Sequence, residues 1–389
     1  MGSGKTSWAI QYLNDHPAEN ILFITPFLNE TDRIQESTGD RFYLPEQRGH
    51  GKLGNMKELL ENESDIASTH ALFLMFDTEC IDILREREYT LFLDESVEAV
   101  KPFIQDRKDD IKYLIEKGDI VIGEKNALIW TGNDDLDFQY NKIRSLCKKH
   151  CLFQVDNKFY TWQFPPEIFE LFKKTYVMTY RFDSSPMRCY FDLYNIRYTK
   201  KSLCKVDNEK YRLIPYRKPD ISRFQQLIKI YTDTKSNSIA VKRSALSKSW
   251  FNNGNNCKNI KTLKDRLYNF FRNKSQAKGN EIIWTTFKDC KGKLKGKGFS
   301  DSFLACNCKA TNDYADRKYL AYCLNFFMNP EIKKFFQTQG IKVDEDGYAL
   351  SEMIQWIWRS RIRKGESIVV YIPAKRMRDM FVEWLNGEQ

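Results

Sequence analysis

Short apolar runs alternate with helical patterns through the first hundred residues of the chain. The runs Asn20–Thr25, Asp65–Thr69 and Tyr89–Leu93 are typical of buried strands, and Asn55–Asn62 has the spacing of a helix. Strands that alternate with helices favour a parallel α/β sheet, in which ligands bind at the carboxyl ends of the strands. The polar residues that follow each run are therefore the candidates for chemistry.

The alternation of strands and helices becomes less regular between about 103 and 175 and then resumes. This stretch holds a charged helical segment, Asp109–Lys117, and an aromatic stretch, Phe159–Phe164, before the β-rich run Tyr176–Thr179. The sequence therefore predicts a first α/β unit over 1–195 that carries an insertion.

A second α/β unit is predicted over 221–389, after a linker at 196–220. Its basic insertion lies at about 242–297. The elements that the pattern predicts in this unit are helices at Ile221–Tyr231, Tyr314–Met328 and Leu350–Arg363, and strands at Ser238–Val241, Glu281–Thr285 and Ser367–Ile372.

Length and composition exclude several classes of protein. A chain of 389 residues with 42% apolar residues can bury one large core or two ordinary ones. No stretch approaches the roughly 20 consecutive apolar residues of a membrane-spanning helix, and the first residues do not resemble a signal peptide. We expect no membrane partner and a cytoplasmic location.

The 10 cysteines are too sparse for a secreted disulfide scaffold. The pairs Cys147/Cys151 and Cys306/Cys308 lack a second pair at zinc spacing, so buried thiols are expected.

The net charge of +10 is unevenly distributed. Residues 1–140 carry 14 Lys/Arg against 28 Asp/Glu, whereas residues 235–298 carry 16 against 3. Concentrated positive charge, here including Lys242 and Arg243, favours a polyphosphate partner. The aromatic residues expected to stack on its bases are Trp250, Phe251, Tyr268, Phe270 and Phe271. A solvated, lysine-rich surface is the alternative.

The opening MGSGKTS matches the end of the phosphate-loop pattern G-x-x-x-x-G-K-[ST]. Backbone amides of such a loop bind phosphates, the lysine reaches the terminal phosphates, and the hydroxyl of Thr6 would bind Mg²⁺. The first glycine of the pattern and the strand before it would lie upstream of Met1. The residues expected to bind the nucleotide are Gly2, Ser3, Gly4, Lys5, Thr6 and Ser7.

An acidic pair follows the apolar run at residues 91–93. Asp94 would bind Mg²⁺, and Glu95 would orient or deprotonate the attacking water. Acidic residues after a strand also serve as helix caps, but the separation of 89 residues from Lys5 to Asp94, with two strands between them, suits a phosphate-loop domain.

Polar residues also follow the other two strands. In a nucleic-acid motor, hydroxyls and amides at these positions hold phosphates of the bound strand. The candidate nucleic-acid contacts are Thr25, Pro26, Ser68, Thr69 and His70. The alternatives are a simple turn at Thr25-Pro26 and a capping or packed histidine at His70.

A basic segment near the C-terminus supplies candidate nucleotide sensors. Read as a helix, 355–363 would place Gln355, Arg359 and Arg363 at i, i+4 and i+8, on one face. Three donors on one face suit a γ-phosphate, the arginine-finger role. The alternative is a basic amphipathic helix with Trp356 and Trp358 in the core.

Taken together, these motifs resemble those of superfamily 2 helicases, and more closely the helicases of bacteriophages and mobile elements. MGSGKTSWAI resembles motif I, ILFITPF motif Ia, IASTHALF motif Ib or Ic, LFLDES motif II, YVMTYRFDSS motif III, IIWTTF motif IV and QWIWRSRIR motif VI. The segment Cys306–Asp313 occupies the place of motif V, which implies polar contacts to nucleic acid from Lys309, Thr311 and Asn312.

Three features depart from that family. Ser96 replaces the usual Ala or His of motif II, and any adenine-reading motif would lie upstream of the phosphate loop. Motif VI carries Trp358 where glycine is usual, and its last arginine lies eight rather than seven residues from Gln355. The choice between Arg361 and Arg363 stays open.

The resemblance implies two RecA-like phosphate-loop NTPase lobes with parallel sheets, each with an insertion, that use ATP and Mg²⁺. It implies a helicase or translocase acting on single-stranded or forked DNA rather than RNA, in replication of a phage or mobile element within a bacterial cell. A helicase-like binding module without hydrolysis and a small-molecule phosphate-loop kinase are the alternatives. Stimulation of ATP turnover by DNA distinguishes them, since a kinase has no use for the basic segment.

Overall fold

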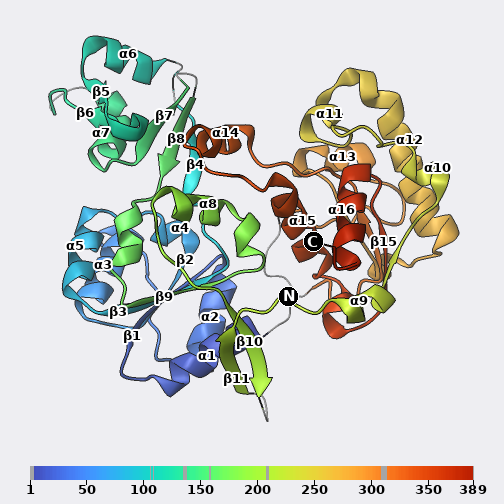
Figure 1. Cartoon of the computed structure of the whole chain (residues 1–389), viewed down its shortest axis with the longest axis horizontal. Helices are drawn as coiled ribbons and strands as arrows, with labels where there is room; N and C mark the ends of the chain where they lie inside the picture. Colours follow the sequence, from blue (N-terminus) through green and yellow to red (C-terminus); the bar gives the residue numbers. More distant parts are fainter. Residues whose placement is uncertain are drawn as a thin grey trace. The chain divides into compact units, whose positions relative to one another are not determined.

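The computed structural model describes residues 4–105, 107, 109–134, 138–156, 159–206, 210–307 and 313–388. They form two compact units, shown in Figure 1. Residues 4–216 and 329–344 make up the N-terminal unit, and residues 217–328 and 345–388 make up the C-terminal unit. Among the described residues, no helix has the length and apolar character needed to cross a bilayer.

The N-terminal unit is built on a four-stranded parallel sheet in the order β2-β1-β3-β9. Its strands are β1 (Asn20–Thr25), β2 (Ile66–Thr69), β3 (Tyr89–Asp94) and β9 (Lys174–Met178). The register pairs Thr25 with Thr69 and Asp94 with Met178, so the carboxyl ends of all four strands lie at one edge of the sheet. The polar residues after each strand are thereby brought together.

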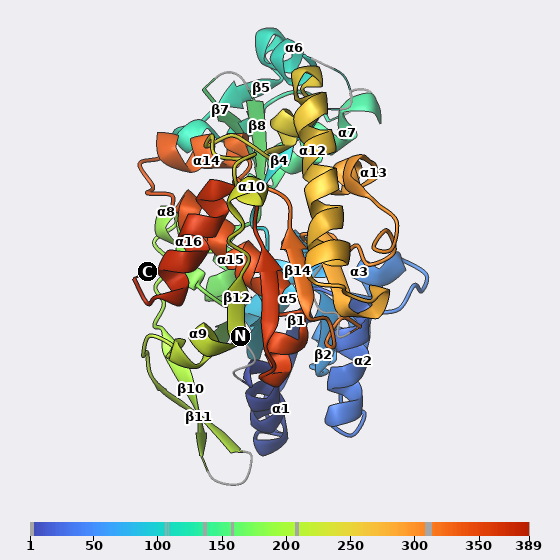
Figure 2. The same cartoon turned by 90° about the vertical axis from the view of Figure 1, so that its right-hand side faces the viewer.

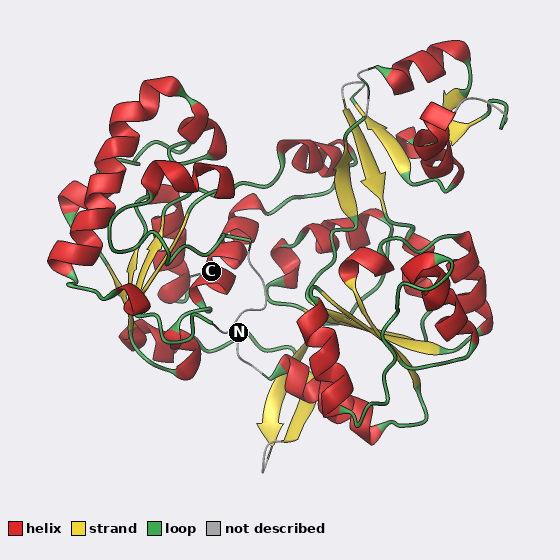
Figure 3. Ribbon diagram, turned by 180° about the vertical axis from the view of Figure 1, so that it is seen from behind, coloured by secondary structure: helices red, strands yellow, loops and turns green. Residues whose placement is uncertain are grey.

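Helices surround this sheet (Figure 3). They are α1 (Lys5–Asp15), α2 (Leu28–Ser37), α3 (Gly51–Glu61), α4 (His70–Phe73), α5 (Thr78–Glu86) and α8 (Pro186–Leu193). Trp8 and Leu13 of α1 pack with Phe23 and Phe92 of the strands in the buried core. The apolar positions of α1 thus fix this helix on the sheet.

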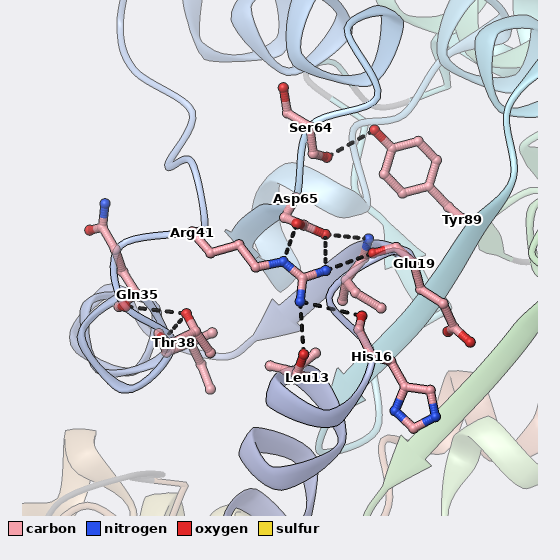
Figure 4. Close-up of polar contacts among 11 residues, drawn as sticks. Leu13, His16, Glu19, Gln35, Thr38, Arg41, Ser64, Asp65 and Tyr89 are labelled. Carbon is pink, nitrogen blue, oxygen red and sulfur yellow. Dashed lines mark hydrogen bonds and ion pairs between the residues drawn. The ribbon is translucent and has the colours of Figure 1, made fainter.

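A half-buried arginine, Arg41, ties the end of α1 to the rest of the unit (Figure 4). The Arg41 guanidinium donates to the Leu13 carbonyl at 2.7 Å and the Glu19 carbonyl at 2.7 Å, and it pairs with both carboxylate oxygens of Asp65. Asp65 also accepts from the Ile21 amide at 2.8 Å. The Leu13 carbonyl, which lies in the last turn of α1, is satisfied in this way.

The predicted insertion contains a small antiparallel subdomain. Its strands and helices are β4 (Val100–Phe103), α6 (Asp110–Lys117), β5 (Ile120–Ile122), β6 (Leu128–Trp130), α7 (Asn141–Lys148), β7 (Leu152–Val155) and β8 (Phe159–Gln163). The strands form a sheet in the order β4-β8-β7 and a hairpin, β5–β6. Helix α14 (Pro330–Thr338), though distant in sequence, packs on this sheet. The buried Cys147 and Cys151 belong here, and burial raises the pKa of each thiol to about 12.

The segment at 196–220, predicted to be a linker, contains a hairpin that folds with the N-terminal unit. Strands β10 (Lys201–Val206) and β11 (Lys210–Pro215) pair antiparallel, with Leu203 opposite Leu213. Both leucines pack against the α1 core, and Figure 1 shows the hairpin beside α1. The expected linker is therefore part of the N-terminal unit, because alternating apolar residues on one face of the hairpin pack against its core.

The C-terminal unit has a second parallel sheet, in the order β12-β15-β14-β13 (Figure 2). Its strands are β12 (Ile228–Ile230), β13 (Ile282–Thr285), β14 (Tyr319–Tyr322) and β15 (Ile368–Tyr371). Its helices are α9 (Ser222–Leu227), α10 (Thr234–Asn237), α11 (Lys248–Asn252), α12 (Cys257–Tyr268), α13 (Lys291–Leu294), α15 (Glu345–Ile357) and α16 (Lys375–Leu385). The predicted α/β class with parallel sheets is confirmed.

Besides the helix predicted to continue through 363, which is described with the candidate site, three element predictions in this unit are wrong. The predicted helix at 314–328 contains β14, a central strand, and residues 228–230 of the first predicted helix form β12. The predicted strand at 238–241 is reduced to one bridge, between Ala240 and Ala374. A strand buried on both faces has a continuous apolar sequence, which periodicity alone does not distinguish from a buried helix.

Candidate nucleotide and nucleic-acid site

Helix α1 begins directly after Gly4, which has a φ of 79°. No side chain caps this helix end, so its first amides can receive an anion. A Cβ on Gly4 would lie 2.2 Å from Cε1 of Tyr211, a half-buried residue of β11. Both the backbone conformation and the adjacent ring therefore require glycine here. Lys5 and Thr6 are half-buried, Ser7 is exposed, and Gly2 and Ser3 lie outside the described residues.

Tyr211 is held at this position by Gln11 of α1. The Gln11 side-chain amide donates to the Tyr211 carbonyl at 3.2 Å and accepts from the Tyr211 amide at 2.8 Å. These two bonds anchor β11 two helical turns from Gly4. No sequence motif marks either residue, because the contact joins positions 200 residues apart.

Lys5 and Glu95 meet at the carboxyl edge of the sheet. Lys5 Nζ lies 3.8 Å from Glu95 Oε1, and Thr179 Oγ1 donates to Glu95 Oε2 at 2.9 Å. Glu95 has a φ of 65°, the left-handed region that non-glycine residues rarely adopt. The motifs expected to hold phosphate and to activate water thus lie side by side, with a residue after β9 orienting the carboxylate.

Asp94 ends β3 and is largely buried. Its desolvation, together with repulsion from Glu95, raises the pKa of Asp94 to about 7, although Lys5 opposes the shift. A carboxylate in this environment favours a nearby cation. Oxygen donors such as the Asp94 carboxylate and the Thr6 hydroxyl are those that Mg²⁺ prefers. The described residues contain no group of three His, Cys, Asp or Glu able to hold a metal, so the remaining ligands would be phosphate oxygens and water.

The loops after β1 and β2 adjoin this acidic pair. His70 Nε2 lies 2.9 Å from the Asp94 carbonyl oxygen, and Thr69 caps α4 by accepting from the Leu72 amide. Thr25 and Ser68 are buried, and Thr25 Oγ1 has no hydrogen-bond partner among the described residues. Of the five predicted contacts, Pro26, Thr69 and His70 are the ones partly open to solvent.

The prediction of one helix through 355–363 is wrong. Helix α15 ends at Ile357, and a separate 3₁₀ turn covers Arg361–Lys364. Trp358, the residue after α15, is buried against Phe224 and Trp384.

Gln355, Arg359 and Arg363 therefore do not share one helical face. The Gln355 amide lies 3.3 Å from Ser351 Oγ. Arg359 is half-buried and Arg363 is exposed. Arg361, the residue left open as an alternative, donates to the Ser367 carbonyl at 2.6 Å within its own unit. This bond gives Arg361 a structural role that is evident only in the fold.

Two of the five predicted nucleic-acid contacts of the C-terminal unit lie among the residues that the structure describes. Lys242 and Arg243 are exposed on a loop that Asn325 fixes by donating to the Arg243 carbonyl at 2.7 Å. Lys309, Thr311 and Asn312 lie outside the described residues.

Three of the five aromatic residues expected to stack on bases are core residues instead. Phe251, Phe270 and Phe271 are buried, because the helices of the basic segment need an apolar face to pack on their sheet. Tyr268 is exposed and Trp250 is half-buried.

Comparison with solved structures finds distant matches. Solved structures of an XPD helicase, an apo form of XPD and S. tokodaii Xpd4 align with this chain at TM-scores of 0.43, 0.49 and 0.45 and 12% identity. These alignments cover 98–100% of this chain and 92–93% of the other chains. At such TM-scores they carry no weight for function.

Sequence relatives give the clearer result. A family model described as the YonV C-terminal Rossmann-like domain matches residues 222–385. Over 410 residues the chain is 38% identical to the SPbeta prophage-derived uncharacterized protein YonV of Bacillus subtilis (strain 168). That alignment covers 100% of this chain and 98% of the relative. The chain therefore belongs to the YonV family.

Proposed function

We propose that this chain is an ATP-dependent nucleic-acid helicase or translocase that requires Mg²⁺. Its substrate is single-stranded or forked DNA rather than RNA. The observation that carries the proposal is the contact of Lys5 with Glu95 at the carboxyl edge of the parallel sheet, beside the uncapped start of α1. A lysine at a helix N-terminus facing an acidic pair is the arrangement that nucleotide hydrolysis needs.

The candidate site residues of the N-terminal unit each have a defined role in this proposal. The amides from Gly4 to Ser7 and the Lys5 ammonium bind the phosphates of ATP. Thr6 and Asp94 hold Mg²⁺, which supplies neutralisation of phosphate charge. Glu95 orients the attacking water and accepts its proton, and Thr179 keeps the Glu95 carboxylate in place through its 2.9 Å hydrogen bond.

DNA contacts in this proposal come from Pro26, Thr69 and His70, with Lys242 and Arg243 of the C-terminal unit. The link from His70 to the Asp94 carbonyl offers a route by which strand binding alters the acidic pair. Gln355, Arg359 and Arg363 are proposed as the residues of the C-terminal unit that sense the nucleotide. The prophage origin of the 38% identical relative supports a role in replication of a mobile genome.

The test is ATP hydrolysis by the full chain, with and without single-stranded DNA, beside Lys5→Ala and Arg359→Ala. DNA should raise the rate, and both substitutions should abolish it. Lys52→Ala, which removes an exposed lysine from α3, is the matched control for charge and should hydrolyse ATP normally.

The other outcomes identify the alternatives. DNA binding without hydrolysis by the unmodified chain would make it a nucleic-acid-binding module. Hydrolysis that DNA does not stimulate, with phosphate transferred to a small molecule, would make it a kinase. Full activity of Lys5→Ala would contradict the nucleotide site itself.

A further inference from the structure

The basic segment of the C-terminal unit lines an open pocket of about 380 Å³. One wall is the C-terminal end of α11 with the two residues that follow it, Phe251 to Gly254, and the opposite wall is one face of α12. Lys293 of α13 completes the lining. Pockets that hold small ligands have volumes of roughly 300–1,000 Å³, so this one suits a ligand of about one nucleotide.

The α12 wall combines apolar and cationic groups in a regular pattern. Cys257, Ile260, Lys261 and Lys264 are spaced at i, i+3, i+4 and i+7, which places them on the same face of the helix. Ile260 is buried, Lys264 is half-buried, and Lys261 and Cys257 are exposed. This face of α12 is therefore apolar at its buried position, Ile260, and cationic at the more exposed positions, Lys261 and Lys264.

The facing wall offers hydrogen-bonding groups and is held in place. The Lys293 ammonium donates to the Phe251 carbonyl at 2.6 Å and lies 3.3 Å from Asn252 Oδ1. This contact holds the C-terminal end of α11 in place, where Asn252 and Asn253 are exposed. Amide side chains both donate and accept, so they can pair with the edge of an unstacked base.

We propose that this pocket binds one nucleotide of a DNA single strand. The base enters between the two walls, Asn252 and Asn253 contact its edge, and Lys261 and Lys264 neutralise the flanking phosphates. The chemistry of the lining, an apolar floor with amides and two ammonium groups, matches a base with its phosphates. The inference rests on the proposed function and adds a subsite that grips the strand in the C-terminal unit.

The first experiment uses the unmodified chain and its own thiols. Cys257 lines the pocket and Cys204 of β10 is exposed elsewhere, so the two can be compared in one alkylation reaction followed by mass spectrometry. An oligothymidylate of about 16 nucleotides should slow alkylation of Cys257 at least about fivefold and leave Cys204 unchanged. Equal alkylation of Cys257 with and without the strand would overturn the proposal.

Two further arms identify the ligand. Thymidine monophosphate at the same nucleotide concentration should protect Cys257 much less than the strand, because it lacks the second flanking phosphate. Equal protection would make this a mononucleotide site. Polyglutamate should not protect Cys257, and protection by it would show that the pocket recognises an acidic chain instead of nucleic acid.

The second experiment compares two double variants with the same change in charge. Lys261→Ala/Lys264→Ala should weaken binding of oligothymidylate at least about tenfold and reduce the log–log salt slope by about 1.4, since each phosphate contact contributes about 0.7. Lys258→Ala/Lys295→Ala removes two lysines of the same segment that do not line the pocket, and should weaken binding less than about threefold. Equal losses of affinity in the two double variants would show only a general effect of charge and would contradict the pocket.

Failure of this inference and failure of the proposed function give different results. An unmodified chain that neither binds DNA nor hydrolyses ATP contradicts the proposed function. An unmodified chain that does both, but whose Cys257 stays fully reactive on DNA, contradicts the pocket alone.

Discussion

At the scale of single residues, Thr179 provides the sharpest test of how Glu95 is oriented. Thr179→Val keeps the side-chain volume but removes the hydroxyl that donates to Glu95 Oε2. Loss of a hydrogen bond to a charged group costs roughly 1.5 kcal/mol, so DNA-stimulated ATP turnover should fall about tenfold.

Thr175→Val on the adjoining strand β9 is the matched control. The Thr175 hydroxyl is buried and has no hydrogen-bond partner in the described part of the chain, so its loss should leave turnover unchanged. Equal effects of the two variants would mean that Thr179 acts only through packing.

Gly4 is the residue whose replacement combines two separate penalties. Gly4→Ala places an L-residue at a φ of 79° and drives its Cβ into the Tyr211 ring. The backbone strain alone should lower the free energy of unfolding by roughly 1–2 kcal/mol, and the clash should add to it. Urea denaturation measures the sum.

Gly39→Ala separates these penalties, because Gly39 has a φ of 65° but no heavy atom within 4 Å of the added Cβ. Gly39→Ala should lower the free energy of unfolding only by the cost of the backbone strain. In a Tyr211→Ala background, the additional cost of Gly4→Ala should fall toward that of Gly39→Ala, and a coupling energy near zero would contradict the contact between Gly4 and Tyr211.

At the scale of secondary-structure elements, Arg41 holds the end of α1 through its carbonyl contacts and its ion pair with Asp65. Both side chains are more than four-fifths buried, at 18% and 15% exposed. Arg41→Ala would leave the Asp65 carboxylate with only the Ile21 amide as a donor and would remove the donor of the Leu13 and Glu19 carbonyls. The free energy of unfolding should fall by roughly 3 kcal/mol in urea denaturation.

Lysine should not rescue this position, since one ammonium cannot reproduce the two-pronged contact with Asp65. Arg48→Ala is the control, because its pair with Glu46 is largely exposed, at 67% and 60%. That variant should change stability by less than about 0.5 kcal/mol. Similar losses from both substitutions would show that Arg41 has no special role.

At the scale of the whole molecule, charge is segregated along the chain. Residues 1–140 carry 14 basic and 28 acidic residues, and residues 235–298 carry 16 and 3. Binding of a single strand should therefore depend on the basic segment and weaken steeply with salt. With about three phosphates neutralised, affinity should fall about 20-fold between roughly 50 and 200 mM salt, as measured by fluorescence anisotropy. An affinity independent of salt would contradict a phosphate-binding surface.

Sequence by itself determined the features that depend on local periodicity. The strand at Asn20–Thr25 and the run from Tyr89 were predicted because apolar residues follow one another without interruption, and the α/β class followed from their alternation with helices. Lys5, Asp94 and Glu95 could be proposed as a site because residues after parallel strands meet at one edge of the sheet.

Only the tertiary structure decided the features that depend on distant partners. Tyr319–Tyr322 is a strand because neighbouring strands pair with it on both sides, and its apolar sequence would equally suit a buried helix. Helix α15 ends at Ile357, and the next residue, Trp358, packs on Phe224 and Trp384, which are distant in sequence. Tyr211 reaches Gly4 across more than 200 residues, and such a contact leaves no pattern in the local sequence because packing, not periodicity, creates it.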